Sequence, residues 1–290
     1  MLPLTKILLP VDFSERALGA ARCVKALARC FQSEITLLHV VTPPHYEFGA
    51  LEVGGSMLSE LFASRTAQIE KELAEFCSEE LQGLRVKRLV IEGDPARRIV
   101  EHAHAEKVDL IVMPTHGYGP FRRFILGSVT AKVLHDADCP VWTGVHMAET
   151  PSREGPHLGT VICAVDLHEQ SARVVNWAAK FAASVGARLI VLHATATLEL
   201  AEGEYSDPAW RTALEKQARQ EISGLLASAG AQAEIQVEIG DPAEVVRATA
   251  EGRQGDLVVI GRGSAAGVFG RLRTNAYAII RESPCPVVSV

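Results

Sequence analysis

Short runs of apolar residues alternate with longer amphipathic segments through the first half of the chain. The runs are too short for helices and rich in branched residues, which is typical of buried strands. They are Lys6–Val11, Glu34–Val40, Arg85–Glu92, Leu110–Met113 and Val141–Val145. The segments between them carry apolar residues along one face at helical spacing and are predicted to be helices. They are Ser14–Phe31, Met57–Leu81, the stretch from Asp94–Pro95 to Glu106, and a segment that begins at Ser128 and stops before Cys139–Pro140.

This alternation of strands and helices predicts an α/β fold. Buried strands that are joined by helical crossovers form parallel sheets with both faces covered. We therefore expect a doubly wound, flavodoxin-like parallel sheet, in which ligands bind beyond the carboxyl ends of the strands where the strand order reverses. The residues at such ends, which we expect to share one crevice, are Asp12, Val40, Met113 and Pro114.

The second half of the chain repeats the first segment by segment, which is typical of a tandem architecture. The matching segments are Val161–Asp166 with Ile7–Asp12, Leu189–His193 with Ile35–His39, Glu238–Ala243 with Ile91–Ala96, Asp256–Ile260 with Asp109–Met113, and Cys285–Val288 with Cys139–Trp142. Between the halves, His146–His157 is polar and carries proline and glycine, so it is predicted to be a linker. The sequence therefore predicts two tandem α/β domains, residues 1–146 and residues 157–290.

The loop that follows the fourth predicted strand has the composition of a phosphate-binding loop. It carries Gly117, Gly119 and Gly127, and Ser128 then begins a helical pattern. The first amides of a helix have no intrahelical acceptor, and the helix dipole adds partial positive charge, so an anion is favoured there. Ser128 is predicted to be the N-cap residue. Because Ala131 stands where a capping box would need Glu or Gln, the amides and the hydroxyl are available to a ligand.

Gly117, nine intervening residues and Gly127–Ser128 form a spacing that resembles the nucleotide signature of the universal stress protein family, Gly-x2-Gly-x9-Gly-(Ser/Thr). The resemblance covers essentially the whole chain, because the chain contains the unit twice. Its other elements are Lys6–Ser14, Leu38–Val40 and Cys139–Val141. The first glycine of the signature falls on Pro114, which has no amide hydrogen. A contact through that amide is therefore lost, whereas the carbonyl is still available.

The resemblance implies an ATP-binding protein, with Mg²⁺ or Mn²⁺ carried in on the nucleotide. It implies that Asp12 and the backbone at Val40 hold the adenine end. The backbone at Met113 and Pro114 would lie by the ribose. The residues implied to hold the phosphates are Gly117, Gly127, Ser128 and Val129, with Thr130 as a further candidate. In the family each unit has five strands and the last strands commonly pair two units, so the chain would be a pseudo-dimer, with a homodimer as a further expectation.

The corresponding loop of the second half has changed. Gly261 stands in the place of Pro114, and the loop that follows is one residue shorter. Arg273 occupies the place of Gly127, where its side chain should crowd the site unless it swings out to pair with phosphate. Other positions also differ: Thr274 replaces Ser128, Ala194 replaces Val40 and His168 replaces Ser14, while Asp166 is retained. We interpret the second site as degenerate, with weaker binding, another ligand or none.

Composition and charge narrow the function further. The formal net charge is −6 with no long basic run, which argues against nucleic acid as the main partner. Apolar residues make up 48% and charged residues 22%, enough for an ordinary core. No signal peptide or membrane span is visible, so we expect a cytoplasmic protein without a membrane partner. The six cysteines are scattered without a Cys-x-x-Cys pair, and we interpret them as buried reduced thiols rather than zinc ligands or disulfides.

Three functions are compatible with these patterns. The favoured one is an ATP-binding, nucleotide-dependent stress-response protein whose main site lies in the first half. The second is a tandem protein–protein interaction module that binds no nucleotide, in which Asp12 and Gly127–Ser128 only begin helices; Pro114 and the changed second loop favour it. The third is a slow ATPase. It is least supported, because no residue is placed as a nucleophile or general base and no Walker A sequence is present.

Overall fold

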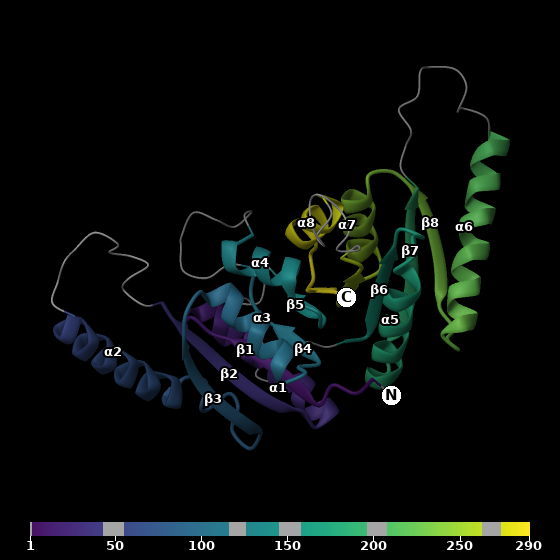
Figure 1. The fold of residues 1–290 in the computed structure, drawn as a ribbon. Coiled ribbons are helices and arrows are strands. Elements are labelled where there is room, and N and C mark those ends of the chain that lie inside the picture. Colours follow the sequence, from purple (N-terminus) through teal and green to yellow (C-terminus); the bar gives the residue numbers. More distant parts are fainter. Residues whose placement is uncertain (1, 43–54, 116–125, 145–157, 196–207, 263–273) are drawn as a thin grey trace. The chain divides into compact units, whose positions relative to one another are not determined.

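The computed structural model describes residues 2–42, 55–115, 126–144, 158–195, 208–262 and 274–290 (Figure 1). The chain divides into two compact units, one consisting mainly of Pro3–Trp142 and the other mainly of His157–Val290. Both predicted domain boundaries, 146 and 157, lie outside the described residues and stay predictions. The pairing of last strands that would make the chain a pseudo-dimer also stays a prediction.

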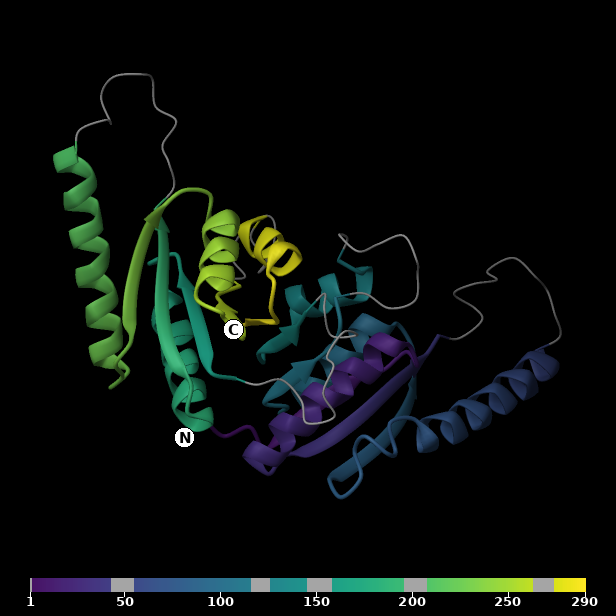
Figure 2. The same ribbon diagram turned by 180° about the vertical axis from the view of Figure 1, so that it is seen from behind.

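Parallel strands form the sheet of the first unit, in the order β3-β2-β1-β4-β5. They are β1 (Lys6–Pro10), β2 (Glu34–Val41), β3 (Arg85–Glu92), β4 (Leu110–Val112) and β5 (Val141–Thr143). The helices are α1 (Glu15–Phe31), α2 (Gly55–Glu75), α3 (Pro95–Ala105) and α4 (Ser128–Asp136). Helices α3 and α4 lie over one face, in front in Figure 1, and α1 lies over the other, in front in Figure 2. The strand order reverses between β1 and β4, as in a doubly wound sheet.

The second unit repeats this topology, with parallel strands in the order β8-β7-β6-β9-β10. The strands are β6 (Thr160–Val165), β7 (Arg188–Thr195), β8 (Glu234–Ile239), β9 (Leu257–Ile260) and β10 (Val287–Ser289). The helices are α5 (Ser171–Val185), α6 (Pro208–Ser228), α7 (Pro242–Gly252) and α8 (Thr274–Glu282). Figure 1 shows α5 and α6 on one side of this sheet and α7 and α8 on the other. The prediction of two tandem doubly wound α/β units is therefore confirmed.

The second predicted helix differs from α2 at its carboxyl end. The pattern predicts Met57–Leu81, whereas α2 spans Gly55–Glu75 and turns follow it. Cys77 has a φ of 55° and Gly83 a φ of 79°, in the left-handed region that ends a right-handed helix. Leu81 is buried, so it continues the apolar stripe without continuing the helix. Hydrophobic periodicity therefore identifies the face that packs inward but not the last helical residue.

One carboxylate joins the amino ends of the two central strands of the first unit. Asp109, just before β4, accepts hydrogen bonds at Oδ2 from the Thr5 amide (2.7 Å), the Thr5 hydroxyl (2.8 Å) and the Lys6 amide (2.9 Å). In the second unit Asp256 Oδ2 likewise accepts from two successive amides, at 2.8 and 2.9 Å. Strand order reverses between β1 and β4, so the Asp109 bridge fixes their register at the end opposite the crevice.

Replacing Asp109 by alanine removes all three contacts at the start of β1. Hydrogen bonds to a charged group contribute about 1.5–3 kcal/mol when sheltered, so for this partly exposed carboxylate we expect the free energy of unfolding to fall by about 1–2 kcal/mol. Urea denaturation measures the change. Glu70→Ala, at an exposed α2 position with no ion pair in the described part of the chain, is the control and should stay within about 0.5 kcal/mol of wild type. Equal effects of the two variants would contradict the structural role of Asp109.

Candidate functional site

The predicted site residues of the first unit lie at the edge of the sheet where the strand order reverses. Asp12 follows β1, Val40 lies near the end of β2 and Pro114 follows β4. Parallel strands place all their carboxyl ends at one edge, and the helices that follow begin there. The same edge therefore receives the N-terminus of α1, directly after Asp12, and the N-terminus of α4.

Asp12 is half-buried, and the first turn of α1 holds its carboxylate. Its Oδ1 accepts hydrogen bonds from the Ser14 amide (3.1 Å) and the Ser14 hydroxyl (2.5 Å). Ser14 is also the N-cap of α1, because its Oγ accepts from the Ala17 amide at 3.2 Å. Oδ2 of Asp12 has no hydrogen bond to any described residue. The protein thus fixes one carboxylate oxygen and leaves the other for a ligand donor.

The residue that follows Asp12 is in an unusual conformation that the sequence did not predict. Phe13 has a φ of 63°, in the left-handed region that bulky residues rarely adopt. Its ring packs on His39, with centroids 4.6 Å apart, and edge-on against Phe76 at 5.3 Å. Leu167 has a φ of 58° at the matching place in the second unit. This repeated turn sets the aspartate at the corner between strand and helix, and no local sequence signal favours it.

Strand β2 extends beyond the end of β1. The last pair between them is Pro10 with Leu38, so among the described strands Val40 pairs only with β3. His39 Nδ1 donates a hydrogen bond to the Val11 carbonyl at 2.8 Å and ties the two strand ends together. His39 therefore has a structural role. The β1-facing backbone edge at Val40 is unpaired within the same strands and lies beside Asp12.

Met113 and Pro114 are buried, so only their backbone can face a ligand. The Met113 amide is already used, because it donates to the Trp142 carbonyl at 3.0 Å. The Pro114 carbonyl accepts from the Thr130 hydroxyl at 3.0 Å. Thr130 is 3% exposed, so its side chain supports the loop instead of facing a ligand. A ribose contact would use the Met113 carbonyl or the second lone pair of the Pro114 carbonyl.

Helix α4 begins at Ser128, and Gly127 is its N-cap residue. The prediction that Ser128 is the N-cap is wrong by one position, because Gly127 takes the extended cap conformation (φ −62°, ψ 147°). No side chain of the described residues caps this helix. The Gly127 amide donates inward to the Thr115 carbonyl at 2.8 Å. The first intrahelical bond runs from the Ala131 amide to the Gly127 carbonyl, also at 2.8 Å.

This geometry leaves three amides without an acceptor inside the helix, those of Ser128, Val129 and Thr130. Ser128 is exposed, so its hydroxyl is accessible beside them. The α4 N-terminus can therefore offer consecutive amide donors and one hydroxyl to an anion, although the Gly127 amide is not among them. The remaining loop residues singled out by the sequence, Gly117 and Gly119, lie outside the described residues.

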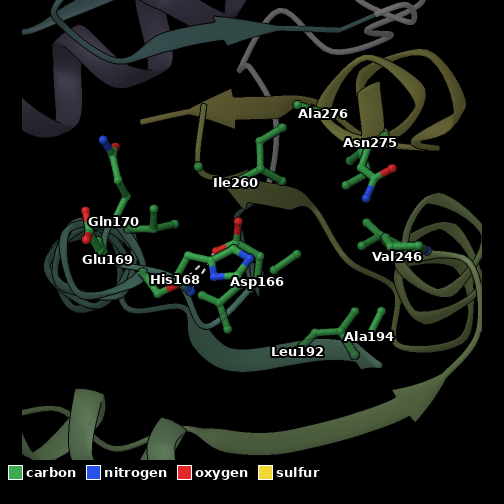
Figure 3. Close-up of a pocket in the computed structure, with 17 residues that line it drawn as sticks. Asp166, His168, Glu169, Gln170, Leu192, Ala194, Val246, Ile260, Asn275 and Ala276 are labelled. Atoms are coloured by element: carbon green, nitrogen blue, oxygen red, sulfur yellow. Dashed lines mark hydrogen bonds between the residues drawn. The ribbon is translucent and has the colours of Figure 1, made fainter. Parts of the chain in front are cut away.

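The second unit has a cavity of about 410 Å³ at the carboxyl ends of β6, β7 and β9 (Figure 3). Asp166, Ala194 and Gly261 line it, and each matches a predicted site residue of the first unit. The turn before α5, the end of β7 and the first turn of α8 supply most of the other walls. The sequence changes in the second half have therefore not filled this end of the crevice.

A different serine holds the aspartate in the second unit. Asp166 Oδ1 accepts hydrogen bonds from the His168 amide and the Ser171 hydroxyl, both at 3.1 Å. His168 stands in the place of Ser14, whereas Ser171 matches Ala17. The hydroxyl has thus moved three residues along the chain, and the helix begins two residues later than in the first unit. The sequence analysis missed Ser171, and the available signal was the paired loss of one serine and gain of another.

The residue at the end of the fourth strand differs in size between the two units, and so does the residue at the matched position of the helix that faces it in the second unit. A Cβ built on Gly261 would lie 3.1 Å from Val174 Cγ2, which is tighter than ordinary contact. The residue that matches Val174 in the first unit is Ala20, which has no γ-carbons. At these two matched positions the first unit therefore has the larger residue at the strand end and the smaller one on the helix, and the second unit has the reverse. Pro114 is consistent with the smaller partner and need not signal loss of function.

The cysteines are free thiols. Burial raises the pKa of Cys23 and of Cys163 to about 12 and that of Cys285 to about 11, so these thiols are protonated at neutral pH. Cys30 is exposed, unlike the buried thiols that the sequence predicted.

Within the described ranges, no three His, Cys, Asp or Glu side chains come together as a metal site. No described helix combines the length and apolar character needed to cross a bilayer.

Replacing Thr130 by valine keeps the side-chain volume and removes the donor to the Pro114 carbonyl. Leaving that buried carbonyl without this partner should lower the free energy of unfolding by about 1–2 kcal/mol. Thr249→Val is the matched control, because Thr249 is also a buried helical threonine and its hydroxyl has no hydrogen bond among the described residues. Denaturant titration compares the two. If Thr130→Val unfolds at the same midpoint as wild type, the hydroxyl does not hold α4 against the end of β4.

The two halves of the chain each match known proteins. The sequence model of the universal stress protein family matches residues 3–143 and again 157–290. A universal stress protein of Methanocaldococcus jannaschii is 34% identical over 136 residues, covering 47% of this chain and 79% of that protein. One from Mycolicibacterium smegmatis is 25% identical over 292 residues, covering 98% of this chain and 96% of that protein.

Solved structures agree on the fold. The crystal structure of a universal stress protein from Archaeoglobus fulgidus has a TM-score of 0.69 and 21% identity, covering 98% of this chain and 97% of that one. At this identity the likeness speaks for the fold alone. Because the family model matches both halves, the chain belongs to the universal stress protein family, as a tandem two-domain member.

Proposed function

We propose that the first unit binds ATP together with Mg²⁺ or Mn²⁺, and that the chain acts as a nucleotide-dependent stress-response protein. The observation that carries the proposal is the position of the α4 N-terminus. The bond from the Gly127 amide to the Thr115 carbonyl (2.8 Å) ties it to the chain that leaves β4. The bond from the Thr130 hydroxyl to the Pro114 carbonyl (3.0 Å) does the same one turn further on. The unbonded amides are thereby held beyond the carboxyl end of a central strand.

The phosphates would lie against this helix start. The amides of Ser128, Val129 and Thr130 supply donors, and the helix dipole adds partial positive charge at the same place. Gly127 carries no side chain, so the backbone can be approached closely. The exposed Ser128 hydroxyl adds a donor or a ligand for the cation, which arrives on the phosphate oxygens. Gly117 is proposed to add to this cradle from its loop.

The adenine would lie at the end of β1 and β2. Asp12 Oδ2 can accept a hydrogen bond from an exocyclic amine, because only Oδ1 is used by Ser14. The backbone edge at Val40, where β2 continues without β1, offers further hydrogen bonds to a base. The carbonyl of Met113 would face the ribose. Among the described residues of this site none is placed as a nucleophile or general base, which favours regulation over catalysis.

To test the site, Gly127 is replaced by arginine and Mg-ATP binding is measured by isothermal titration calorimetry. The backbone at Gly127 is extended, so an arginine is tolerated there without strain, while its side chain blocks the amides. Losing one or more charge-assisted hydrogen bonds of about 1.5–3 kcal/mol each should weaken binding about tenfold or more. The control is Gly224→Arg, an exposed α6 position where an added Cβ meets nothing within 4 Å.

Equal, undetectable heat from wild type and Gly127→Arg would overturn the site assignment and favour the interaction module that binds no nucleotide. A universal stress protein 26% identical to this chain, covering 46% of this chain and 95% of that one, has been solved in complex with cAMP. Titrations with cAMP, ADP and AMP therefore accompany those with ATP. Phosphate release that is abolished by a chelator and by Ser128→Ala would instead support the slow ATPase.

A further inference from the structure

We propose that the open edge of the sheet in the second unit binds a second copy of this chain, through antiparallel pairing of strand β8 with its own counterpart. A twofold axis would pass beside Val237, near the middle of this strand. Three features of β8 support the proposal: an unpaired backbone edge, the loss of groups that close the matching edge in the first unit, and side chains that complement themselves. The surface does not depend on the proposed nucleotide site.

Strand β8 pairs with β7 and with no other strand among those described. At its carboxyl end, the Gly240 amide points toward β7 and donates to the Thr195 carbonyl at 3.1 Å. A trans peptide points its two polar groups in opposite directions, so the Ile239 carbonyl faces away from β7. Ile239 is itself 49% exposed. This end of the strand therefore presents both a backbone acceptor and an apolar side chain to a partner.

The outward direction holds for every second residue of the strand. Backbone groups alternate sides along a strand, so those of Ile235 and Val237 also face away from β7. Arg219 on α6 donates from Nη1 to the Ile235 carbonyl at 2.9 Å, which agrees with that direction. The carbonyl keeps a second lone pair for a partner strand. Such a row of outward donors and acceptors is a template for pairing with another chain.

The first unit closes the matching edge. Arg98 on α3 donates from Nε to the Glu92 carbonyl at 2.6 Å, and this carbonyl corresponds to that of Ile239. The Arg98 guanidinium also pairs with Glu101 at 3.1 Å, so a charged side chain lies against the end of β3. Strand β3 also carries basic residues, which natural sheets place on edge strands to prevent pairing. They are Arg85, Lys87 and Arg88.

The second unit has lost these closing groups. Val245 stands in the place of Arg98, and Ala248 in the place of Glu101. Strand β8 contains no lysine, arginine or proline. A hollow of about 290 Å³ lies between β8 and α7, and Val245, Ala248 and Gly252 line it from the helix. Figure 2 shows α7 on one side of β8 and α6 on the other. In the described part of the chain, nothing that corresponds to Arg98 therefore covers the Ile239 carbonyl.

The side chains of β8 complement themselves in one antiparallel register. Strand alternation places Ile235, Val237 and Ile239 on one face, and Gln236 and Glu238 on the other. A twofold axis at Val237 sets Ile235 opposite Ile239 of the second copy, so every pair on the first face is apolar. On the other face it sets Gln236 opposite Glu238. Gln236 Nε2 already donates to Glu238 Oε1 of its own chain at 3.1 Å, and its second amide hydrogen remains for the second copy.

Other registers are disfavoured by charge and by the alternation of faces. Sliding the strands by two residues sets Glu234 opposite Glu238 in one direction, and Glu238 opposite its own copy in the other. Like charges directly opposite each other destabilise strand pairing. A slip of one residue sets the apolar face of one strand beside the polar face of the other. One register is therefore favoured, and it is self-complementary, as a twofold interface requires.

The short pairing strand determines the expected strength of the dimer. Strand β8 has six residues, so the interface belongs to the small class, below about 1,200 Å², that is typical of transient complexes. We expect a dimer that dissociates in the micromolar range and is lost on dilution.

The first experiment follows the oligomeric state of the full chain by analytical ultracentrifugation over a wide range of protein concentration. Ile239→Lys puts a charge in place of the exposed apolar residue in both copies, and should raise the dissociation constant of the dimer about tenfold or more. Tyr277→Lys is the control, because Tyr277 on α8 is another large apolar residue of similar exposure, 38%. It should dimerise as wild type does. Circular dichroism checks that both variants are folded.

The second experiment tests the register by disulfide cross-linking. Hydrogen-bonded residues opposite each other in an antiparallel pair have Cα atoms about 5.5 Å apart, within the range of about 4.4–6.8 Å that a disulfide spans. Val237→Cys should therefore form a covalent dimer under mild oxidation with diamide. Ile235→Cys, on the same face, is the matched control, because the copy of residue 235 lies opposite Ile239 instead. Both variants carry Cys30→Ser, which removes an exposed native thiol.

A concentration-dependent dimer that Ile239→Lys weakens and Val237→Cys cross-links supports pairing at this edge. A wild-type chain that stays monomeric at every concentration overturns it. A dimer that Ile239→Lys leaves unchanged, or that Tyr277→Lys weakens equally, assigns dimerisation to another surface and overturns it as well. If Ile239→Lys does not fold, the cysteine variants decide: cross-linking of Ile235→Cys as efficient as that of Val237→Cys, or of neither, contradicts the register at Val237.

Discussion

Parallel pairing of the strands is the constraint on which the rest of each unit depends. Because every strand of a unit runs the same way, all carboxyl ends and all following helix starts lie at one edge of the sheet. The reversal of order at β1 and β4, and at β6 and β9, separates two helix starts at that edge and leaves a crevice between them. Carboxylates at the opposite edge, Asp109 and Asp256, hold the same strand pairs in register. The topology of the sheet thus sets the position of the binding crevice, and the side chains at this edge determine which ligand can bind there.

The two units show how such an edge keeps its geometry while its chemistry changes. A serine hydroxyl contacts the aspartate in both, from the helix N-cap in one and from the first helical residue in the other. Gly261 approaches Val174 in the second unit, and the matching sequence positions of the first unit hold Pro114 and Ala20, so a larger residue at one position accompanies a smaller one at the other. Each change is balanced by a nearby one, because a close-packed interior tolerates exchange of volume better than its loss.

Much of the candidate site could be predicted because its residues sit next to element boundaries that the pattern reveals. Asp12 and Val40 follow apolar runs, and Gly127 precedes a helical pattern, so their common edge follows from the fold class alone. The hydrogen-bonding role of each residue could not be predicted in this way. The Gly127 amide and the Thr130 hydroxyl point inward to carbonyls near the end of β4, which depends on how α4 packs and not on the loop sequence.

The sequence by itself determined the repeat and the order of strands and helices, because periodicity and internal similarity are present in the linear chain. The spacing of Gly117 and Gly127–Ser128 gave the resemblance to the family in the same way. The tertiary structure decided where α2 ends, that Gly127 and not Ser128 caps α4, and that Phe13 adopts a left-handed turn. It also decided that Ser171 takes over from Ser14 and that a cavity persists in the second unit. These outcomes depend on contacts between segments far apart in the sequence, and only the packed chain brings such segments together.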